Sequence, residues 1–152
     1  MKSPVVLFWF RRDLRFNDNA GLFHALKENN QVLPVFIFDS DILEKLDDER
    51  DPRVTFIYDQ VSALKESLQK KRSDLLVHHG KPLEVFMDLF KNFEITAIYT
   101  NHDYEPYARM RDDKVAKFAR TQGAEFKTFK DQTLFEKDEI LTGAGKPYTV
   151  YT

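Results

Sequence analysis

Apolar runs alternate with amphipathic segments along the whole chain. Five runs are apolar enough to form buried strands: Val5–Phe10, Val32–Phe38, Leu75–His79, Ile95–Thr100 and Ala124–Phe129. Such runs are typical of strands that are covered on both faces. Most of the segments between them repeat apolar residues every three or four positions, which is the spacing of an amphipathic helix. The alternation therefore predicts a parallel sheet with helices on both faces.

The predicted helices carry start and stop signals. The first helix is preceded by good N-cap residues: Asn17, Asp18 and Asn19. The second helix is marked by a regular apolar stripe: Val54, Ile57, Tyr58, Val61, Leu64 and Leu68. Pro82 is a first-turn proline for the third helix. The fourth helix is predicted over about Pro106–Gln122, with Gly123 as its C-cap and an inward face of small and apolar residues: Ala108, Val115, Phe118 and Ala119.

We expect these elements to form one doubly wound, Rossmann-like α/β domain with strand order 3-2-1-4-5. The last strand alternates, with Phe126 and Phe129 set against Lys127 and Lys130, as a half-exposed edge strand does. Pro34 would disrupt the middle of a central strand, so we place it at the beginning of the second strand.

Composition narrows the class of protein. The 152 residues are 42% apolar and 32% charged with a net charge of -2, which suits one globular domain without electrostatically driven nucleic-acid binding of its own. Cysteine is absent, which excludes disulfides and thiol chemistry. No apolar run is long enough to span a membrane and Met1–Pro4 leads into a strand, so we expect a cytoplasmic protein that does not contact membranes.

The turn after the first strand is charged and contains no glycine. It carries three arginines and two aspartates: Arg11, Arg12, Arg15, Asp13 and Asp18. In dinucleotide-binding domains, glycines in this turn let a pyrophosphate approach the backbone. This turn is therefore not built to receive a pyrophosphate.

Ligands of doubly wound sheets bind outside the carboxyl ends of the strands, where the strand order reverses. For the predicted order, three segments meet at that point: Arg11–Asn19, Asp39–Ile42 and Asn101–Arg111. Their acceptors, aromatic rings and arginines could hold a planar polar ring. An alternative stays open, in which Glu105 and Asp112 only pair with nearby arginines or favour a helix N-terminus. The irregular, charged stretch Asp39–Pro52 is likewise either a functional loop or a solvated one.

We expect neither a catalytic residue nor a metal site in this chain. His78 and His79 are adjacent on a strand, so they point to opposite faces and cannot chelate one metal. His102 lies beside Asp103, but no third ligand is spaced to help them. Signatures of a phosphate-binding loop or a nucleophilic triad are also absent.

Several segments form a recognisable set: Trp9–Arg15 followed by Asp18-Asn19, Arg53 with Phe56, Leu76-Val77 with Gly80 and Pro82, Asn101–Asp112, and Gly145–Tyr148. On these segments the chain resembles the amino-terminal domain of the DNA photolyase/cryptochrome family. The resemblance spans essentially all 152 residues. The first segment and the run that begins at Asn101 are its most specific parts.

The resemblance implies a role in a longer protein. Family members repair pyrimidine dimers with light or act as blue-light receptors, using FAD in a helical carboxy-terminal domain that also binds DNA and flips out the lesion. In many members the amino-terminal domain holds an antenna chromophore that passes energy to FAD. We expect residues 1–130 to be such an antenna domain of a photolyase-like carbon–carbon lyase, and residues 131–152 to begin the interdomain connector. The chain alone should neither bind FAD nor repair DNA, and surface left bare without the helical domain should favour self-association.

The resemblance also implies the type of antenna. Folate-type relatives carry Asn and Glu at the positions of Tyr107 and Ala108, and a histidine in the loop that leads to Pro52; this chain has none of them. A flavin or deazaflavin is therefore favoured over a folate, and an empty pocket stays an alternative. The residues expected around the chromophore are Arg11, Phe38, Asp39, Arg53, Asp103, Glu105 and Arg109. Asp103 would accept from a ring N–H, and the arginines would balance a phenolate or phosphate.

Three other functions stay open on the sequence. The parent could be a cryptochrome photoreceptor rather than a repair enzyme. A stand-alone nucleotide-binding module of similar topology would show a melting temperature that rises with ATP or AMP. A receiver-like signalling domain would use Asp39 as phosphoacceptor, but it needs an acidic pair after the first strand, where this chain has arginines.

Overall fold

The computed structural model describes residues 3–46, 48, 51–136 and 139–146. Within them, one five-stranded parallel sheet comprises β1 (Pro4–Phe10), β2 (Val32–Asp39), β3 (Leu76–Gly80), β4 (Glu94–Asn101) and β5 (Glu125–Phe129). The strand order β3-β2-β1-β4-β5 confirms the predicted topology. Each strand begins and ends within one residue of its predicted apolar run.

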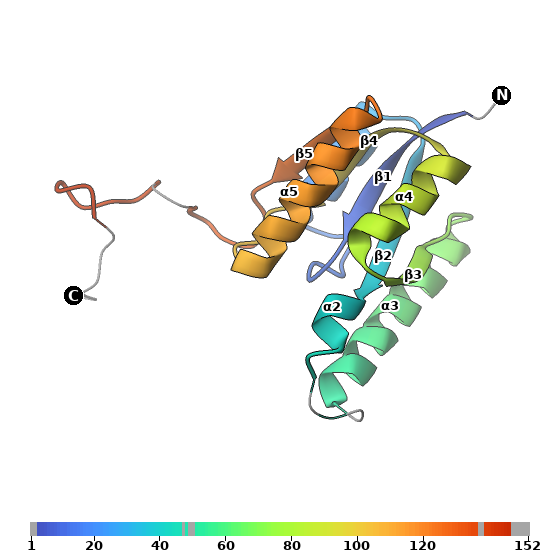
Figure 1. The fold of residues 1–152 in the computed structure, drawn as a ribbon, viewed down its shortest axis with the longest axis horizontal. Coiled ribbons are helices and arrows are strands. Elements are labelled where there is room, and N and C mark those ends of the chain that lie inside the picture. Colours follow the sequence, from blue (N-terminus) through green and yellow to red (C-terminus); the bar gives the residue numbers. More distant parts are fainter. Residues whose placement is uncertain (1–2, 47, 49–50, 137–138, 147–152) are drawn as a thin grey trace.

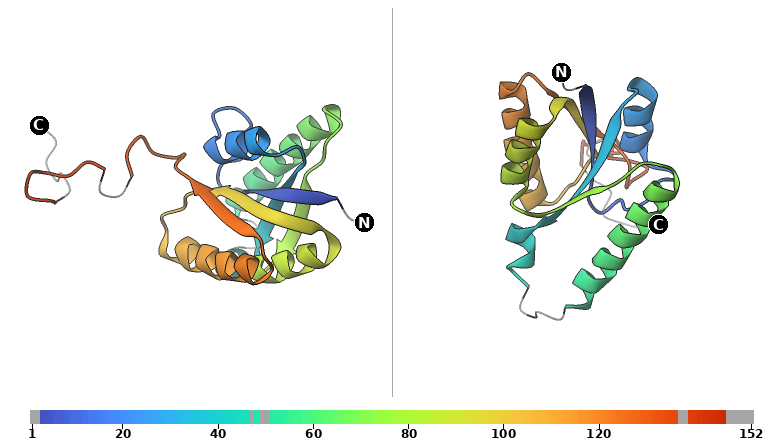
Figure 2. Two further views of the ribbon diagram at one scale, coloured as in Figure 1. Left: turned by 90° about the horizontal axis from the view of Figure 1, so that it is seen from above. Right: turned by 90° about the vertical axis from the view of Figure 1, so that its right-hand side faces the viewer.

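Helices cover both faces of the sheet, as predicted. They are α1 (Ala20–Glu28), α2 (Ser40–Leu43), α3 (Pro52–Lys70), α4 (Pro82–Asn92) and α5 (Pro106–Thr121). Figure 1 shows the chain order, and Figure 2 shows α1 and α3 on one side of the sheet with α4 and α5 on the other. The longest of them, α3, is not apolar enough to cross a membrane, and the same holds for every helix in the described part of the chain.

The core is split by the sheet because successive side chains of a strand point to opposite faces. In β1, Val6, Phe8 and Phe10 pack with α1 and α3, whereas Leu7 and Trp9 pack with α4 and α5. All five side chains are buried, which explains why β1 is apolar without alternation.

Pro34 lies within β2 at a position where the backbone N–H that proline lacks costs the sheet little hydrogen bonding. It pairs with Phe8 of β1, and the pairing of β2 with β3 starts only at the next residue, Val35. At Pro34 the strand therefore has a neighbour on one side, which is where a sheet tolerates proline.

The stretch after β2 differs from the expectation of an irregular loop, because it opens with the one-turn helix α2. The side chain of Asp39 caps this helix by accepting a hydrogen bond from the backbone N–H of Asp41 at 3.1 Å. The sequence did not indicate this helix, because four residues in a charged run are too few to form an apolar stripe. Pro147 and Tyr148, which end the last segment of the resemblance, lie outside the described residues.

The start of α1 is capped by residues from three parts of the chain. Asn19 accepts from the N–H of Leu22 at 3.1 Å, as its N-cap role predicts. The N–H of Gly21 donates to the side chain of Asn101 at 2.7 Å, and that of Ala20 donates to Asp131 at 2.8 Å. Gly21 is required here, because a Cβ would lie 2.7 Å from the Asn101 side-chain oxygen. The first helix is thus completed by β4 and by the segment that follows β5.

Candidate functional site

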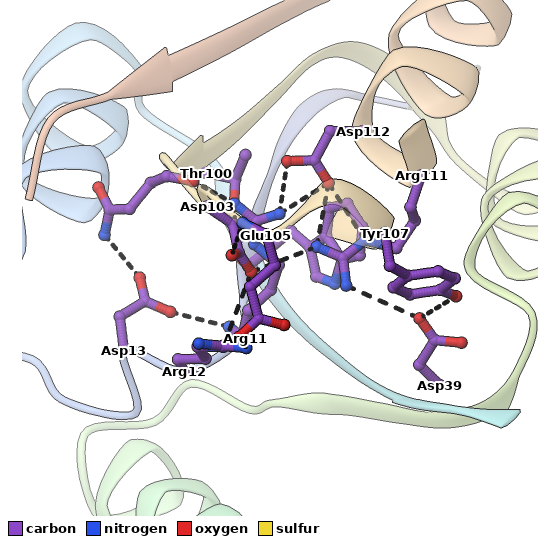
Figure 3. Close-up of polar contacts among 12 residues, drawn as sticks. Arg11, Arg12, Asp13, Asp39, Thr100, Asp103, Glu105, Tyr107, Arg111 and Asp112 are labelled. Atoms are coloured by element: carbon purple, nitrogen blue, oxygen red, sulfur yellow. Dashed lines mark hydrogen bonds and ion pairs between the residues drawn. The ribbon is translucent and has the colours of Figure 1, made fainter. Parts of the chain in front are cut away.

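Charged side chains gather where β1, β2 and β4 end (Figure 3). Arg11 follows β1, Asp39 ends β2, and Asp103 follows β4. The first turns of α5 supply Arg111 and Asp112 to the same place. The three segments predicted to converge at the reversal of strand order do so.

Arg11 is buried and fully engaged with protein groups. Its Nη1 lies 2.7 and 2.6 Å from the two carboxylate oxygens of Asp112, and its Nη2 donates to the backbone oxygen of Asn101. Its side chain is only 8% exposed. Arg11 therefore joins β1, β4 and α5.

Arg111 holds three carboxylates together. Its guanidinium nitrogens lie 3.0 Å from Asp112, 3.7 Å from Asp39 and 3.8 Å from Asp103. Arg111 was not predicted as a site residue, although the periodicity of the helix indicates its position. Arg111 follows Ala108 by three residues and precedes Val115 by four, so it lies on the buried stripe of α5.

Two aromatic rings lie among these cations. The guanidinium carbons of Arg11 and Arg111 lie 5.1 and 4.8 Å from the Trp9 ring centre. Arg111 also lies 5.8 Å from the Tyr107 ring centre, and the Lys45 ammonium lies 5.0 Å from it. These are cation–π distances. Each ring thus contacts two cations, and Arg111 contacts both rings. We call this set of five residues the cation–ring array: Trp9, Tyr107, Arg11, Arg111 and Lys45.

Asp39 and Tyr107 form a fixed pair. The Tyr107 hydroxyl donates to the Asp39 carboxylate at 2.8 Å. Burial of the phenol, together with this bond to an anion, raises the pKa of Tyr107 well above its usual value. Because Asp39 also caps α2, its position is set from two sides.

The carboxylate of Asp103 has few close hydrogen-bond donors. Its side chain is 7% exposed, yet its Oδ2 lies 3.8 Å from both Arg12 Nε and the nearest nitrogen of Arg111, beyond hydrogen-bond length. The other oxygen accepts a 3.3 Å bond from the backbone N–H of Glu105. The two arginines thus offset the charge of Asp103 without lying within hydrogen-bond distance of it.

Arg12 and Glu105 form a more exposed pair at the rim. Arg12 Nη2 lies 2.6 Å from Glu105 Oε1, and the two side chains are 54% and 60% exposed. The bond to Glu105 raises the pKa of Arg12 above its ordinary value. The alternative in which Glu105 pairs with a nearby arginine therefore holds in this structure.

A cavity of about 360 Å³ opens beside Asp103. It is lined by six residues from the loop between β4 and α5, from α5 and from β5: His102, Asp103, Tyr104, Arg109, Asp112 and Thr128. Its volume falls within the range of small-molecule sites. Arg109 stands exposed at this cavity, and among the described residues no hydrogen bond or ion pair ties its side chain to a carboxylate.

The segment after β5 forms part of the surroundings of this cavity. Glu136 lies 2.7 Å from His102 Nδ1, and the Tyr104 hydroxyl donates to it. Burial, followed by this bond to an anion, raises the pKa of Tyr104. Thr128 binds the other ring nitrogen of His102 at 3.0 Å. Glu136 had no signal in the sequence, because its role depends on the path of the chain after the last strand.

Two predicted residues lie apart from the charge cluster. Phe38 packs against the core on the side of α1 and α3, with its ring centre 5.0 Å from that of Phe36. Arg53, at the start of α3, is 74% exposed and pairs with Asp51. The structure thus brings together Arg11, Asp39 and Asp103, places Arg109 beside them and Glu105 at the rim, and leaves Phe38 and Arg53 outside their contacts.

Comparison with known proteins places the chain in a family. The model of the DNA photolyase family matches residues 6–152. A deoxyribodipyrimidine photo-lyase from Synechococcus is 38% identical over 99% of this chain and 31% of its own length. One from Halobacterium salinarum is 37% identical over 96% of this chain and 32% of its own length.

Solved structures agree with the sequence relatives. A photolyase from Sulfolobus tokodaii, described with two FAD molecules and a novel light-harvesting cofactor, matches 90% of this chain and 32% of its own length, with a TM-score of 0.74 at 36% identity. A class III photolyase from Agrobacterium tumefaciens matches 100% of this chain and 30% of its own length, with a TM-score of 0.84 at 28% identity. The chain therefore spans about a third of the length of these relatives. It belongs to the DNA photolyase family.

Proposed function

We propose that this domain holds a light-harvesting chromophore of the flavin or deazaflavin type for a longer protein that repairs pyrimidine dimers with light. In that protein, reduced FAD in a separate helical domain supplies the electron, and this domain supplies excitation energy. The chromophore, when bound, contributes light absorption; the residues of this chain bind it, orient it and keep water from it.

One observation carries the proposal: the buried carboxylate of Asp103 lies at the edge of a cavity with its arginine neighbours held at 3.8 Å. A buried anion is costly unless it is paired and hydrogen-bonded. An N–H on the edge of a flavin or deazaflavin ring would supply the close donor that the arginines do not. The donor set therefore fits a planar ring that presents N–H groups.

The cavity and its other cation support the same ligand class. At about 360 Å³ the cavity has room for the polar part of a ring system. Arg109, exposed at its wall, is placed to pair with a phosphate on the chromophore side chain. Under this assignment Asp103 and Arg109 touch the ligand, while Arg11 and Asp39 position the groups that do. Phe38, Arg53 and Glu105 stay predictions for ligand contact.

A folate is disfavoured at this site. Ala108 is 3% exposed and has no polar atom to offer a pterin ring. Tyr107 gives its hydroxyl to Asp39. Neither position can supply the amide and carboxylate that folate-type relatives carry there.

We further propose that the chain after β5 leads to the helical FAD domain, and that DNA is contacted through that domain alone. Residues 131–136 support this by lying against the antenna domain at two points, Asp131 on Arg15 and Glu136 on His102. Exposed apolar side chains on the outer side of α1, Phe23 and Leu26, offer a surface for the helical domain or, without it, for a second copy.

Binding of FMN, riboflavin, a deazaflavin and a methenyl-folate to the 152-residue chain tests the proposal by equilibrium dialysis and absorption. We expect FMN or the deazaflavin to bind and the folate not to. Asp103→Asn should weaken binding by about 10- to 100-fold, since a hydrogen bond to a charged group contributes about 1.5–3 kcal/mol.

Asp113→Asn is the matched control, because Asp113 lies on α5 outside the lining of this cavity and forms a surface ion pair with Lys117. Arg109→Gln should weaken FMN binding and leave riboflavin, which lacks the phosphate, unchanged. Equal affinity of the native chain and the Asp103→Asn variant for the flavins would overturn the assignment.

A further inference from the structure

The cation–ring array places three cations against two rings that are readily oxidised. Trp9 contacts Arg11 and Arg111, and Tyr107 contacts Arg111 and Lys45, all at 4.8–5.8 Å from a ring centre. Trp9 is the single tryptophan of the chain. Its ring is 1% exposed, so no solvent screens it from the two guanidinium groups.

The array lies directly behind the proposed chromophore site. Asp112 lines the cavity and is bonded to both Arg11 and Arg111. Asp103, also in the cavity wall, lies 3.8 Å from Arg111. The two carboxylates in the cavity wall thus contact Arg11 and Arg111, which in turn contact the Trp9 ring. Figure 3 shows Arg11, Arg111, Asp103 and Asp112 in this cluster.

We propose that the cations of this array make Trp9 and Tyr107 poor electron donors, so that a photoexcited chromophore passes on its energy instead of being quenched. The proposal rests on the proposed function. It assigns Arg11, Arg111 and Lys45 an electrostatic effect on the two rings, which requires no contact between these cations and the ligand.

The competing step is a one-electron transfer. One electron would leave the π system of the indole or phenol and enter the photoexcited flavin ring, giving an oxidised side chain and a singly reduced ring. Return of that electron restores both partners and loses the absorbed energy as heat. An antenna domain has to suppress this step, because indole and phenol are the side chains that excited flavins oxidise most readily.

A cation over a ring opposes the step by a simple electrostatic effect. It is attracted to the negative face of the neutral ring and repelled by the ring's radical cation. The repulsion is larger in a buried place than in water, because the effective dielectric constant is lower. Both terms make removal of an electron harder.

Tyr107 needs this protection most. Its hydroxyl donates to Asp39 at 2.8 Å, and a carboxylate in that position could take the proton when the phenol loses an electron. Arg111 lies 3.7 Å from the same carboxylate and also contacts the Tyr107 ring. It therefore opposes oxidation both at the ring and at the proton acceptor.

The first experiment needs no chromophore. Azide radicals from pulse radiolysis oxidise the native chain, and the indolyl radical absorption reports Trp9 alone. We expect the indolyl yield to rise several-fold in Arg111→Gln. Lys27→Gln is the matched control, because Lys27 lies 5.6 Å from the ring of Phe23, which is hard to oxidise, and it should leave the yield unchanged. An unchanged yield in Arg111→Gln overturns the assignment for Trp9, whether or not any flavin binds.

The second experiment uses bound FMN and separates affinity from quenching. The fluorescence lifetime of the bound fraction should shorten in Lys45→Gln, and Lys45→Gln with Tyr107→Phe should restore it. Lys45 is an exposed residue of the loop after α2, so its replacement leaves the fold intact if Arg111→Gln does not fold. If FMN does not bind, the same measurement uses the deazaflavin. Failure of both to bind contradicts the proposed function, whereas binding with an unchanged lifetime contradicts this inference alone.

Discussion

In two arginine–aspartate pairs of this domain the arginine contacts both carboxylate oxygens, but one arginine is buried and the other is exposed. Arg11 holds both oxygens of Asp112 with 8% of its side chain exposed, whereas Arg53 holds both oxygens of Asp51 with 74% exposed. The first pair connects β1 to α5 across the sequence, and the second spans two residues. The difference teaches that the environment of the ions, more than the bonds between them, decides what each pair contributes.

The buried pair is costly to break and the exposed pair is not. Removing Arg11 takes its two short hydrogen bonds from Asp112, which then keeps Arg111 as its remaining arginine partner. In the exposed pair, water and salt replace the lost partner. Only the buried pair can therefore fix the position of a functional side chain.

Replacing each arginine by glutamine tests this contrast directly and gives the largest expected effect. Arg11→Gln should lower the free energy of unfolding by about 3–5 kcal/mol, because Asp112 and the Asn101 carbonyl lose their buried donor. Arg53→Gln should lower it by less than about 1 kcal/mol. Urea denaturation followed by circular dichroism measures both, and equal losses would contradict the comparison.

Asn101→Ala extends the contrast to a buried side chain that carries no charge of its own. Asn101 accepts from the Gly21 N–H and donates to Asp13 and Asn19, all within the domain. Its loss leaves the buried Gly21 N–H without this acceptor, at about 1–3 kcal/mol, whereas Asp13 and Asn19 keep their bond to each other. Hydrogen exchange at Gly21 should accelerate in the variant. Replacement of exposed Asn92, which caps only its own helix, is the control.

The titration of Tyr107 shows how a buried hydrogen bond to a carboxylate changes the behaviour of a side chain with pH. Because its folded pKa is raised above the ordinary value of 10.0, its stabilising effect is complete below pH 10 and is lost as the pH rises above it. The phenolate absorption of Tyr107, obtained as the difference between the native chain and Tyr107→Phe, should therefore appear only at the pH of alkaline unfolding. Titration at ordinary tyrosine pH would show that the Asp39 bond is not maintained in solution.

The smallest expected effect is a change in the pKa of Asp51 when its exposed partner Arg53 is replaced. Bonds from Arg53 lower the pKa of Asp51 from 3.8 to about 2. The pair is therefore intact above pH 3.8 and is lost as the pH falls toward 2. The carboxyl carbon resonance of Asp51 should titrate near 2 in the native chain and at higher pH in Arg53→Gln, although still below 3.8 because the backbone N–H of residue 53 keeps its bond to Asp51. A midpoint that the substitution does not move would mean that the two side chains do not associate in solution.

The sheet order could be predicted because each strand is an apolar run and each crossover carries a helical stripe. The convergence of Arg11, Asp39 and Asp103 followed from that order, since the carboxyl ends of neighbouring parallel strands meet. The partner of each charge could not be predicted in the same way. Arg109 and Arg111 differ by about half a helical turn, and that rotation decides which one is buried. Glu136 depends on the path of a segment that has no periodicity.

The capping of α1 has a consequence for synthesis. Two of the donors at its first turn reach acceptors 80 and 111 residues later in the chain. During translation the amino end leaves the ribosome first, so the start of α1 stays incompletely capped until the chain after β5 has emerged. The last-made segment thus completes the first-made helix, and the domain closes as a unit late in its own synthesis.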